Sequence, residues 1–243
     1  MEWQESYGGP DDDKAKAIIQ SSDGTFLIIG KSYSNSGMIT DHRGQYDAWV
    51  VKIDPAGGLL WTKSYGGSLY DESFSVVQTP DLGYVIACSS NSSDMDVAFN
   101  KGQEDYWLIK ISPAGIIQWQ QNYGGSLSDR PSSLITTLDG GFLISGTSSS
   151  NDMDVSGNHG ADDFWIVKVD NTGTLMWQKC LGGSLSDECT SLIATVDNNI
   201  VVSGYVQSLD GDVTNLRGMT DYWAAKLTPG GNLINARSLG GSM

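Results

Sequence analysis

The most chemically suggestive stretch of the sequence is a polar loop, DMDVSGNHGADD, that begins at Asp152 and ends at Asp163. Its first, third and fifth positions are Asp152, Asp154 and Ser156, a glycine follows, and Asp163 closes the loop at the twelfth position. This is the spacing of a calcium-binding loop of the EF-hand type, with Asp in place of the final Glu. Calcium is a hard cation that prefers oxygen ligands. The spacing therefore predicts a calcium site that includes Asn158 as a further ligand.

Weaker versions of this loop recur elsewhere in the chain. Their candidate ligands are Asp94, Asp96 and Asp105 in one loop, and Asp210, Asp212 and Asp221 in another. The corresponding N-terminal loop has Ser36 and Met38 at its first and third positions, and we predict no calcium site there. An alternative stays open, because Asp and Asn side chains often accept hydrogen bonds from their own turn backbone, and no helices flank the loops as they do in an EF-hand.

Two further sets of carboxylates repeat along the chain. Asp47, Asp105, Asp163 and Asp221 precede aromatic residues, whereas Asp13, Asp71, Asp129 and Asp187 follow glycine pairs. Carboxylate pairs carry out glycoside hydrolysis, but such catalysis needs one asymmetric site with differently tuned groups. Because these residues recur in every copy, we predict that they brace turns by accepting hydrogen bonds from backbone N–H groups.

The sequence contains no catalytic motif that we can identify. His42 and His159 occupy different places in loops and have no partner pattern for a nucleophile or a metal, which predicts that both are solvated. There is no G-x-S-x-G, P-loop or H-E-x-x-H pattern. The glycine pairs indicate turns rather than phosphate cradles, because no helix follows them.

The aromatic residues fall into two groups with different expected roles. Trp49, Trp107, Trp165 and Trp223 lie in apolar stretches such as YWLIK and FWIVK, which predicts core packing. Tyr7, Tyr65 and Tyr123 stand beside the glycine pairs. We expect these three tyrosines to be exposed and to be candidates for contact with a ligand such as a glycan.

All of these residues belong to one repeated frame. Trp3, Trp61, Trp119 and Trp177 follow each other at steps of 58 residues, and Asn235 holds the fifth place. The copies cover residues 3–60, 61–118, 119–176 and 177–234, with a partial fifth copy at 235–243. An internal repeat fixes the architecture before any motif, so residues 1–243 are predicted to form a single array.

Each copy predicts four strands and no helix. In the second copy these are residues 73–79, 84–90, 105–112 and 116–123, separated by turn signals. Four-stranded antiparallel units of this length are typical of β-propeller blades. A β-solenoid has shorter coils and a β-sandwich would not repeat so strictly. We therefore predict an all-β protein, a β-propeller of four blades with an extra terminal strand.

The extra strand arises because the fourth-strand sequence occurs five times. Residues 1–7 and residues 233–239 both align with it, whereas the other three strands occur four times. An unpaired amphipathic strand next to an open sheet edge favours pairing with another chain. This predicts self-association through the termini; the alternative is that the chain is a segment of a longer array.

Two resemblances bear on the fold. Residues 52–61, 110–119 and 168–177 fit the pattern K-x-[DST]-x-x-G-x-x-x-W, which resembles the tryptophan-docking motif of quinoprotein-like (PQQ-like) β-propellers. The resemblance implies that the Gly makes the turn between the outer strands and that the Trp packs on the next blade, although Asn235 departs from it. The whole repeat also resembles tandem repeats of secreted bacterial surface proteins, which implies export. We expect no PQQ, because four small blades leave little central room.

The composition of the chain argues against two classes of binding partner. The formal charge of −15 argues against binding to nucleic acid or to anionic membranes, and there is no apolar run long enough to span a membrane. No signal peptide precedes Trp3, so an exported protein would be present here in its mature form. Cys180 and Cys189 flank one turn and either form a disulfide or remain free thiols.

Together these features predict a non-catalytic module, secreted or at the bacterial cell surface, that binds a protein partner or a second copy of itself. A carbohydrate-binding, lectin-like propeller is one alternative. A quinoprotein-like oxidoreductase or a polysaccharide-active enzyme is the other.

Overall fold

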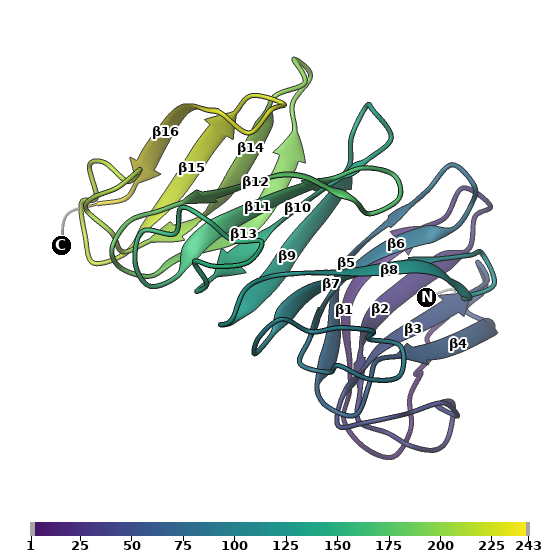
Figure 1. The fold of residues 1–243 in the computed structure, drawn as a ribbon. Helices are drawn as coiled ribbons and strands as arrows, with labels where there is room; N and C mark the ends of the chain where they lie inside the picture. Colours follow the sequence, from purple (N-terminus) through teal and green to yellow (C-terminus); the bar gives the residue numbers. More distant parts are fainter. Residues whose placement is uncertain (1–2, 242–243) are drawn as a thin grey trace. The chain divides into compact units, whose positions relative to one another are not determined.

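The computed structural model describes residues 3–241, and this part of the chain contains sixteen β-strands and no helix (Figure 1). The strands form four antiparallel sheets, each made of four strands that follow one another in the sequence. No helix in the described range is long and apolar enough to cross a membrane. The predicted all-β fold, with four blades of the β-propeller type, is confirmed.

Each blade runs from its first to its fourth strand in chain order. Blade 1 contains β1 (Asp13–Gln20), β2 (Phe26–Ser32), β3 (Asp47–Ile53) and β4 (Leu59–Tyr65). Blade 2 contains β5 (Asp71–Gln78), β6 (Tyr84–Ser90), β7 (Asp105–Ile111) and β8 (Ile117–Tyr123). Blade 3 contains β9 (Asp129–Thr136), β10 (Phe142–Ser148), β11 (Asp163–Val169) and β12 (Leu175–Leu181). Blade 4 contains β13 (Asp187–Ala194), β14 (Ile200–Val206), β15 (Asp221–Leu227) and β16 (Leu233–Leu239).

The chain divides into two compact units, which we describe separately. Unit 1 consists of the residues up to 100 together with 106–122, and unit 2 consists of 101–105 together with the residues from 123 onward. Unit 1 therefore holds blade 1 and most of blade 2, and unit 2 holds blades 3 and 4. That residues 1–243 form one continuous array stays a prediction.

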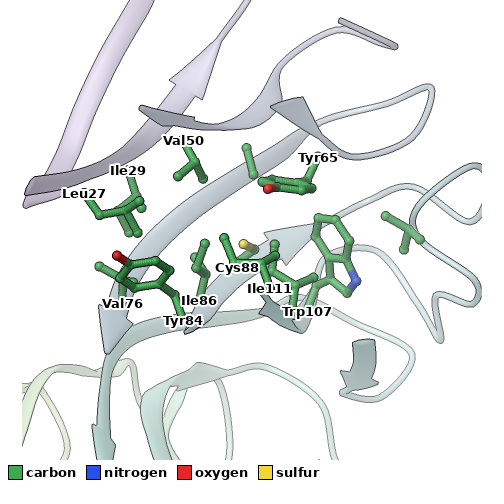
Figure 2. Close-up of a cluster of buried hydrophobic side chains, with 13 residues drawn as sticks. Leu27, Ile29, Val50, Tyr65, Val76, Tyr84, Ile86, Cys88, Trp107 and Ile111 are labelled. Carbon is green, nitrogen blue, oxygen red and sulfur yellow. The ribbon is translucent and has the colours of Figure 1, made fainter. Parts of the chain in front are cut away.

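The core of unit 1 lies between its two sheets. Leu27, Ile29 and Val50 of blade 1 pack against Tyr84 and Ile86 of blade 2, as Figure 2 shows. Strand β3 is buried along its whole length because its alternate side chains face two different covers. Its even-numbered positions join this core, and its odd-numbered positions form a smaller cluster on the opposite face of the sheet.

Unit 2 repeats this arrangement with different side chains. Phe164 and Ile166 of blade 3 pack against Val202, Trp223 and Leu227 of blade 4. The rings of Phe164 and Trp223 meet almost at right angles, with their centroids 5.1 Å apart. Such edge-to-face contacts are favourable for aromatic pairs. The predicted burial of Trp49, Trp107, Trp165 and Trp223 is confirmed.

The repeated tryptophans contact the glycine turns between the third and fourth strands. Trp3 lies on Gly57, and Trp177 lies on Gly231. A Cβ atom on Gly57 would lie 2.7 Å from the Trp3 ring, and one on Gly231 would lie 2.9 Å from the Trp177 ring. Both glycines also have a positive φ, so the turn needs glycine for its backbone as well as for its space.

The N-terminal copy of the fourth strand differs from the prediction. Residues 3–7 pair with no strand but lie against blade 1, where Trp3 Nε1 donates to Pro55 O over 3.1 Å and Tyr7 Oη donates to Gly57 O over 2.6 Å. The blades therefore start at the aspartates after the glycine pairs, about ten residues later than the predicted copies, and the fourth blade is completed by β16.

We expect Trp61→Ala to lower the free energy of unfolding by about 2 to 4 kcal/mol, because the indole packs against the unit 1 core and leaves a cavity when removed. Trp3→Ala is the matched control, since its ring is 39 % exposed and docks on a comparable glycine. Denaturant unfolding of both variants measures the difference. A Trp61→Ala effect no larger than that of Trp3→Ala would contradict this role.

Candidate functional site

Three glycine pairs are each surrounded by four carboxylates. The Gly66 cluster, in unit 1, contains Asp47, Asp71, Asp94 and Asp96. The Gly124 cluster contains Asp105, Asp129, Asp152 and Asp154, and the Gly182 cluster contains Asp163, Asp187, Asp210 and Asp212; both lie in unit 2. The structure therefore brings together residues that the sequence analysis had assigned to two separate roles, as metal ligands and as turn braces.

Most of these carboxylates bind the backbone of the glycine turn. In the Gly124 cluster, Asp129 Oδ2 accepts hydrogen bonds from Gly125 N over 2.7 Å and from Ser150 Oγ over 2.9 Å. Asp152 Oδ1 accepts from Ser126 N over 2.8 Å. The equivalent contacts recur in the other two clusters. The carboxylates thus hold the turn by satisfying N–H groups that no strand partner reaches.

Asp105 is different because one of its oxygens has no hydrogen-bond partner. Its side chain is fully buried, and its Oδ2 accepts from Lys101 N over 2.5 Å. Its Oδ1 is unpartnered and faces Gly124. A Cβ on Gly124 would lie 2.2 Å from this oxygen and 2.8 Å from Asp129 Oδ2, so two buried carboxyl groups meet at the same glycine. The same oxygen is unpartnered in Asp47 and in Asp163.

Burial changes the acidity of these groups. It raises the pKa of Asp105 to about 7, and the negative charge of Asp129 adds to the effect. It raises the pKa of Asp47 and of Asp163 to about 6. Burial also raises the pKa of Asp71, which sits opposite Asp47. Two carboxylates in one dry site cannot both ionise cheaply, and a proton on the unpartnered oxygen of Asp105 would give that oxygen a hydrogen bond to donate.

A basic residue completes each cluster. Arg43, Lys101, His159 and Arg217 follow each other at the 58-residue step, and the backbone N–H of each donates to the carboxylate four residues later. The side chains of Arg43 and Lys101 form ion pairs with Asp96 and Asp154, and His159 Nε2 lies 3.9 Å from Asp212 Oδ2. The sequence analysis missed this position, because its residue type changes from Arg to Lys to His and only its spacing to the next carboxylate persists.

The expectation of a solvated histidine is wrong for His42, whereas His159 is exposed as predicted although it contacts a carboxylate. His159 Nδ1 lies 2.8 Å from Asp163 Oδ2. His42 Nδ1 lies 3.2 Å from Asp47 Oδ2, and its side chain is only 11 % exposed.

The predicted calcium loop at 152–163 does not close around a common point. Asp152 and Asp154 turn toward the glycine pair, Ser156 Oγ accepts from Gln178 Nε2 over 2.6 Å, and Asn158 Nδ2 donates to a backbone carbonyl. Within residues 3–241 there is no group of three or more His, Cys, Asp or Glu side chains placed to hold a metal ion. Calcium binding stays a prediction, and it would require the carboxylates to release their backbone donors.

The predicted ligand-binding tyrosines are not exposed as a set. Tyr65 is 3 % exposed, and its hydroxyl donates to Gly115 O over 2.7 Å. Tyr123 is likewise buried and bonded to Gly173 O, whereas Tyr7 is half-buried. The expectation of exposure is wrong for Tyr65 and Tyr123, because each ring fills the core while its hydroxyl reaches a turn carbonyl.

The cysteines are all free thiols and all buried. Of the two alternatives for Cys180 and Cys189, the structure has the unbridged one. Cys88, which stands where blades 1, 3 and 4 have glycine, lies in the unit 1 core (Figure 2).

Comparison with known proteins gives one curated relative at low identity. No protein-family model matches the sequence. The regulatory protein FlaEY of Caulobacter vibrioides is 25 % identical over 238 residues, which cover 93 % of this chain and 24 % of that protein. The chain therefore spans about a quarter of the length of this relative.

Solved structures show only distant likeness. A protein of unknown function from Bacteroides caccae matches 93 % of this chain and 82 % of its own, at 8 % identity and a TM-score of 0.47. A mutant of the Synechocystis apocarotenoid oxygenase matches 96 % of this chain and 51 % of its own, at 13 % identity and a TM-score of 0.48. Neither likeness carries an argument about function.

The raised pKa values of the buried aspartates predict a stability profile that is shifted toward acidic pH. Because folding raises the pKa of Asp47, Asp105 and Asp163 above the ordinary 3.8, their contribution is fully present below about pH 4 and is lost as the pH rises through about 6 to 7. Side-chain hydrogen bonds lower the pKa of Asp81 and Asp139 to about 2, so their contribution is lost in stronger acid. We expect Tm to peak near pH 4 and to fall between pH 5 and pH 8 in metal-free buffer. Calorimetry showing a Tm that is flat or rising from pH 5 to pH 8 would contradict this.

A pair of amide substitutions separates the two carboxyl roles in the Gly124 cluster. Asp105→Asn supplies an N–H in place of a titrating oxygen, so we expect Tm at pH 8 to be maintained or raised and its fall between pH 5 and pH 8 to be reduced. Asp129→Asn removes an acceptor of Gly125 N and should cost about 1 to 3 kcal/mol at every pH. Equal losses at pH 8 in both variants would show that Asp105 is no more than another turn brace.

Proposed function

We propose that this chain is a non-catalytic binding and assembly module that works outside the cell or at the cell surface. The observation that carries the proposal is the place where repeat symmetry breaks. It breaks at Asn235, which takes the place of the repeated Trp, and in residues 3–7, whereas the polar clusters keep the same contacts from copy to copy.

The polar clusters support a structural role. An enzyme concentrates an acid, a base and a binding pocket of different tuning in one asymmetric place. Here the carboxylates bind backbone N–H groups in three equivalent settings, and the variable position changes only between Arg43, Lys101 and His159. These contacts fix the glycine turns. Because the same contacts recur in three clusters, they support a role in positioning the blades and not in binding a substrate.

The location outside the cell and the resemblance to quinoprotein-like propellers are also parts of the proposal. The resemblance to secreted bacterial surface repeats supports export, and the contact of Trp3, Trp61 and Trp177 with turn glycines supports the quinoprotein-like docking scheme without its cofactor. Similarity to a quarter of a regulatory protein is compatible with a role exerted by binding. Calcium, if bound at the aspartate loops, would stiffen the module.

The experiment compares binding with turnover on the purified full chain. A glycan array and sedimentation over a wide concentration range test for ligand binding and self-association, while polysaccharide depolymerisation and PQQ-dependent oxidation assays test for chemistry. We expect binding or association without turnover. Turnover that Asp105→Asn abolishes, in a variant with unchanged folding, would replace this proposal with an enzymatic one.

A further inference from the structure

A cavity lies between blades 3 and 4 of unit 2, where a turn joins the first two strands of each blade. Its volume is about 610 Å³, which is within the range of pockets that bind small ligands. The turns after β9 and after β13 form two of its sides. Its lining includes the apolar residues Leu138, Leu143, Ile200 and Pro229 and the polar residues Thr137 and Lys168.

The polar side of this cavity contains a buried ammonium group and a hydroxyl. Lys168 is only 5 % exposed, and its Nζ donates to Thr137 Oγ1 over 2.7 Å and to Asp139 Oδ1 over 2.8 Å. The Thr137 hydroxyl donates in turn to Asp139 Oδ1 over 2.5 Å. Because a hydroxyl oxygen can accept two hydrogen bonds, Thr137 Oγ1 keeps one acceptor position for a ligand.

In unit 1 the equivalent place is occupied by the ring of Tyr84. Tyr84 is fully buried, its Oη lies 2.6 Å from Ser21 Oγ, and Lys52 Nζ lies 5.5 Å from its ring centroid. A cation at this distance from an aromatic face is attracted to it. Ser21 and Lys52 precede Thr137 and Lys168 by two 58-residue steps. The hydroxyl and the ammonium group that contact a phenol in unit 1 therefore have counterparts in unit 2.

Blade 4 does not supply the phenol itself. Two steps after Tyr84 the chain has Ile200. Its aliphatic side chain has no ring to face Lys168 and no hydroxyl to bond Thr137. Unit 2 thus keeps the groups that contact a phenol and lacks the tyrosine that would provide it.

A second replacement opens the same region toward solvent. Gln78 Oε1 accepts from Ser22 N over 2.8 Å and so joins the two neighbouring turns in unit 1. Two steps after Gln78 the chain has Ala194, which lines the cavity and is exposed. The methyl group of Ala194 cannot reach across to the other turn, so this side gives a ligand a way in.

We propose that this cavity binds a ligand with a phenol ring. The ring takes the place that Tyr84 fills in unit 1, with one face toward the Lys168 ammonium group and its hydroxyl donating to Thr137 Oγ1. Benzene fills a cavity of about 150 Å³, so the ligand carries a further group, which extends past Ala194. This inference names a ligand class for the binding function proposed above and rests on that function.

The first test uses p-cresol, which is the tyrosine side chain without its backbone. We expect saturable one-to-one binding to the full chain in a ligand-observed NMR titration. The affinity should be about fivefold or more above that of 4-methylanisole, whose ether oxygen cannot donate to Thr137. Absence of saturable p-cresol binding, or equal affinities for the two compounds, overturns the inference.

A substitution that places a ring in the cavity tests the location. Ile200→Tyr gives blade 4 the residue that blade 2 has, and we expect it to lower the affinity for p-cresol by roughly tenfold or more, because the ring competes for the same space. Ile193→Tyr is the matched control, since Ile193 is 56 % exposed on β13 and does not line the cavity, and it should leave the affinity unchanged. Equal effects of the two substitutions would contradict the proposed location.

If Ile200→Tyr does not fold, Ala194→Gln at an exposed position takes its place. The glutamine restores the side chain that joins the turns in unit 1, so we expect it to narrow the opening and to weaken p-cresol binding by roughly threefold. An unchanged affinity in a folded Ala194→Gln variant would overturn the inference.

The phenol could belong to a free small molecule or to a tyrosine in a peptide, and a further probe separates these sources. Tighter binding of N-acetyl-tyrosinamide than of p-cresol identifies a peptide tyrosine, and weaker binding identifies a free phenolic molecule; either result supports the phenol site. Failure of both probes overturns this inference. Self-association or glycan binding in the same preparation would then still preserve the proposed function.

Discussion

A blade of this protein has two apolar faces, and each face must be covered for the sheet to be stable in water. In unit 1 the cover on one side of blade 1 is blade 2, and on the other side it is a small cluster around Trp49 with Tyr7 from the N-terminal segment. In unit 2 blade 4 covers blade 3.

The glycine clusters provide the second constraint, because the blades face each other only if the turns between them are fixed. A buried carboxylate is costly unless it is paired with donors, and Asp71, Asp129 and Asp187 each accept a backbone N–H from the glycine pair. Asp105 has an oxygen without a donor, and its burial raises its pKa, which favours the neutral form. The buried aspartates that fix the glycine turns therefore also make the stability of the fold depend on pH.

Much of the fold could be predicted because one period of 58 residues aligns strands, turns and core in every copy. The strands of blade 2 fall within two residues of their predicted bounds. What failed is the direction of side chains. Linear spacing placed Asp152 and Asp154 in a calcium-like loop, but it cannot show that both turn back to Gly124 and Ser126. It also cannot show whether residues 3–7 find a partner strand, since that depends on sheet edges far along the chain.

The candidate site could be predicted only in part, for a related reason. The turn-bracing role of Asp129 followed from its repetition, and the contact with Gly125 N agrees with it. The position of Lys101 and His159 was missed because the two residues differ in type. What they share is the spacing to the next carboxylate, to which each donates its backbone N–H. The prediction that Tyr65 is exposed failed because a tyrosine beside a turn is compatible with either an exposed or a buried side chain. Only the packing of the folded chain shows that its ring is buried and that its hydroxyl donates to a turn carbonyl.

The central claim is the proposed function, that this protein works by binding and self-association and not by chemistry at the polar clusters. Hydrogen–deuterium exchange of the full chain, compared at low and high protein concentration, tests it directly. The account predicts that strands of the blades gain protection as concentration rises, while the aspartate loops stay unchanged. Protection that appears in the aspartate loops alone, or none at all in a folded protein, would contradict it.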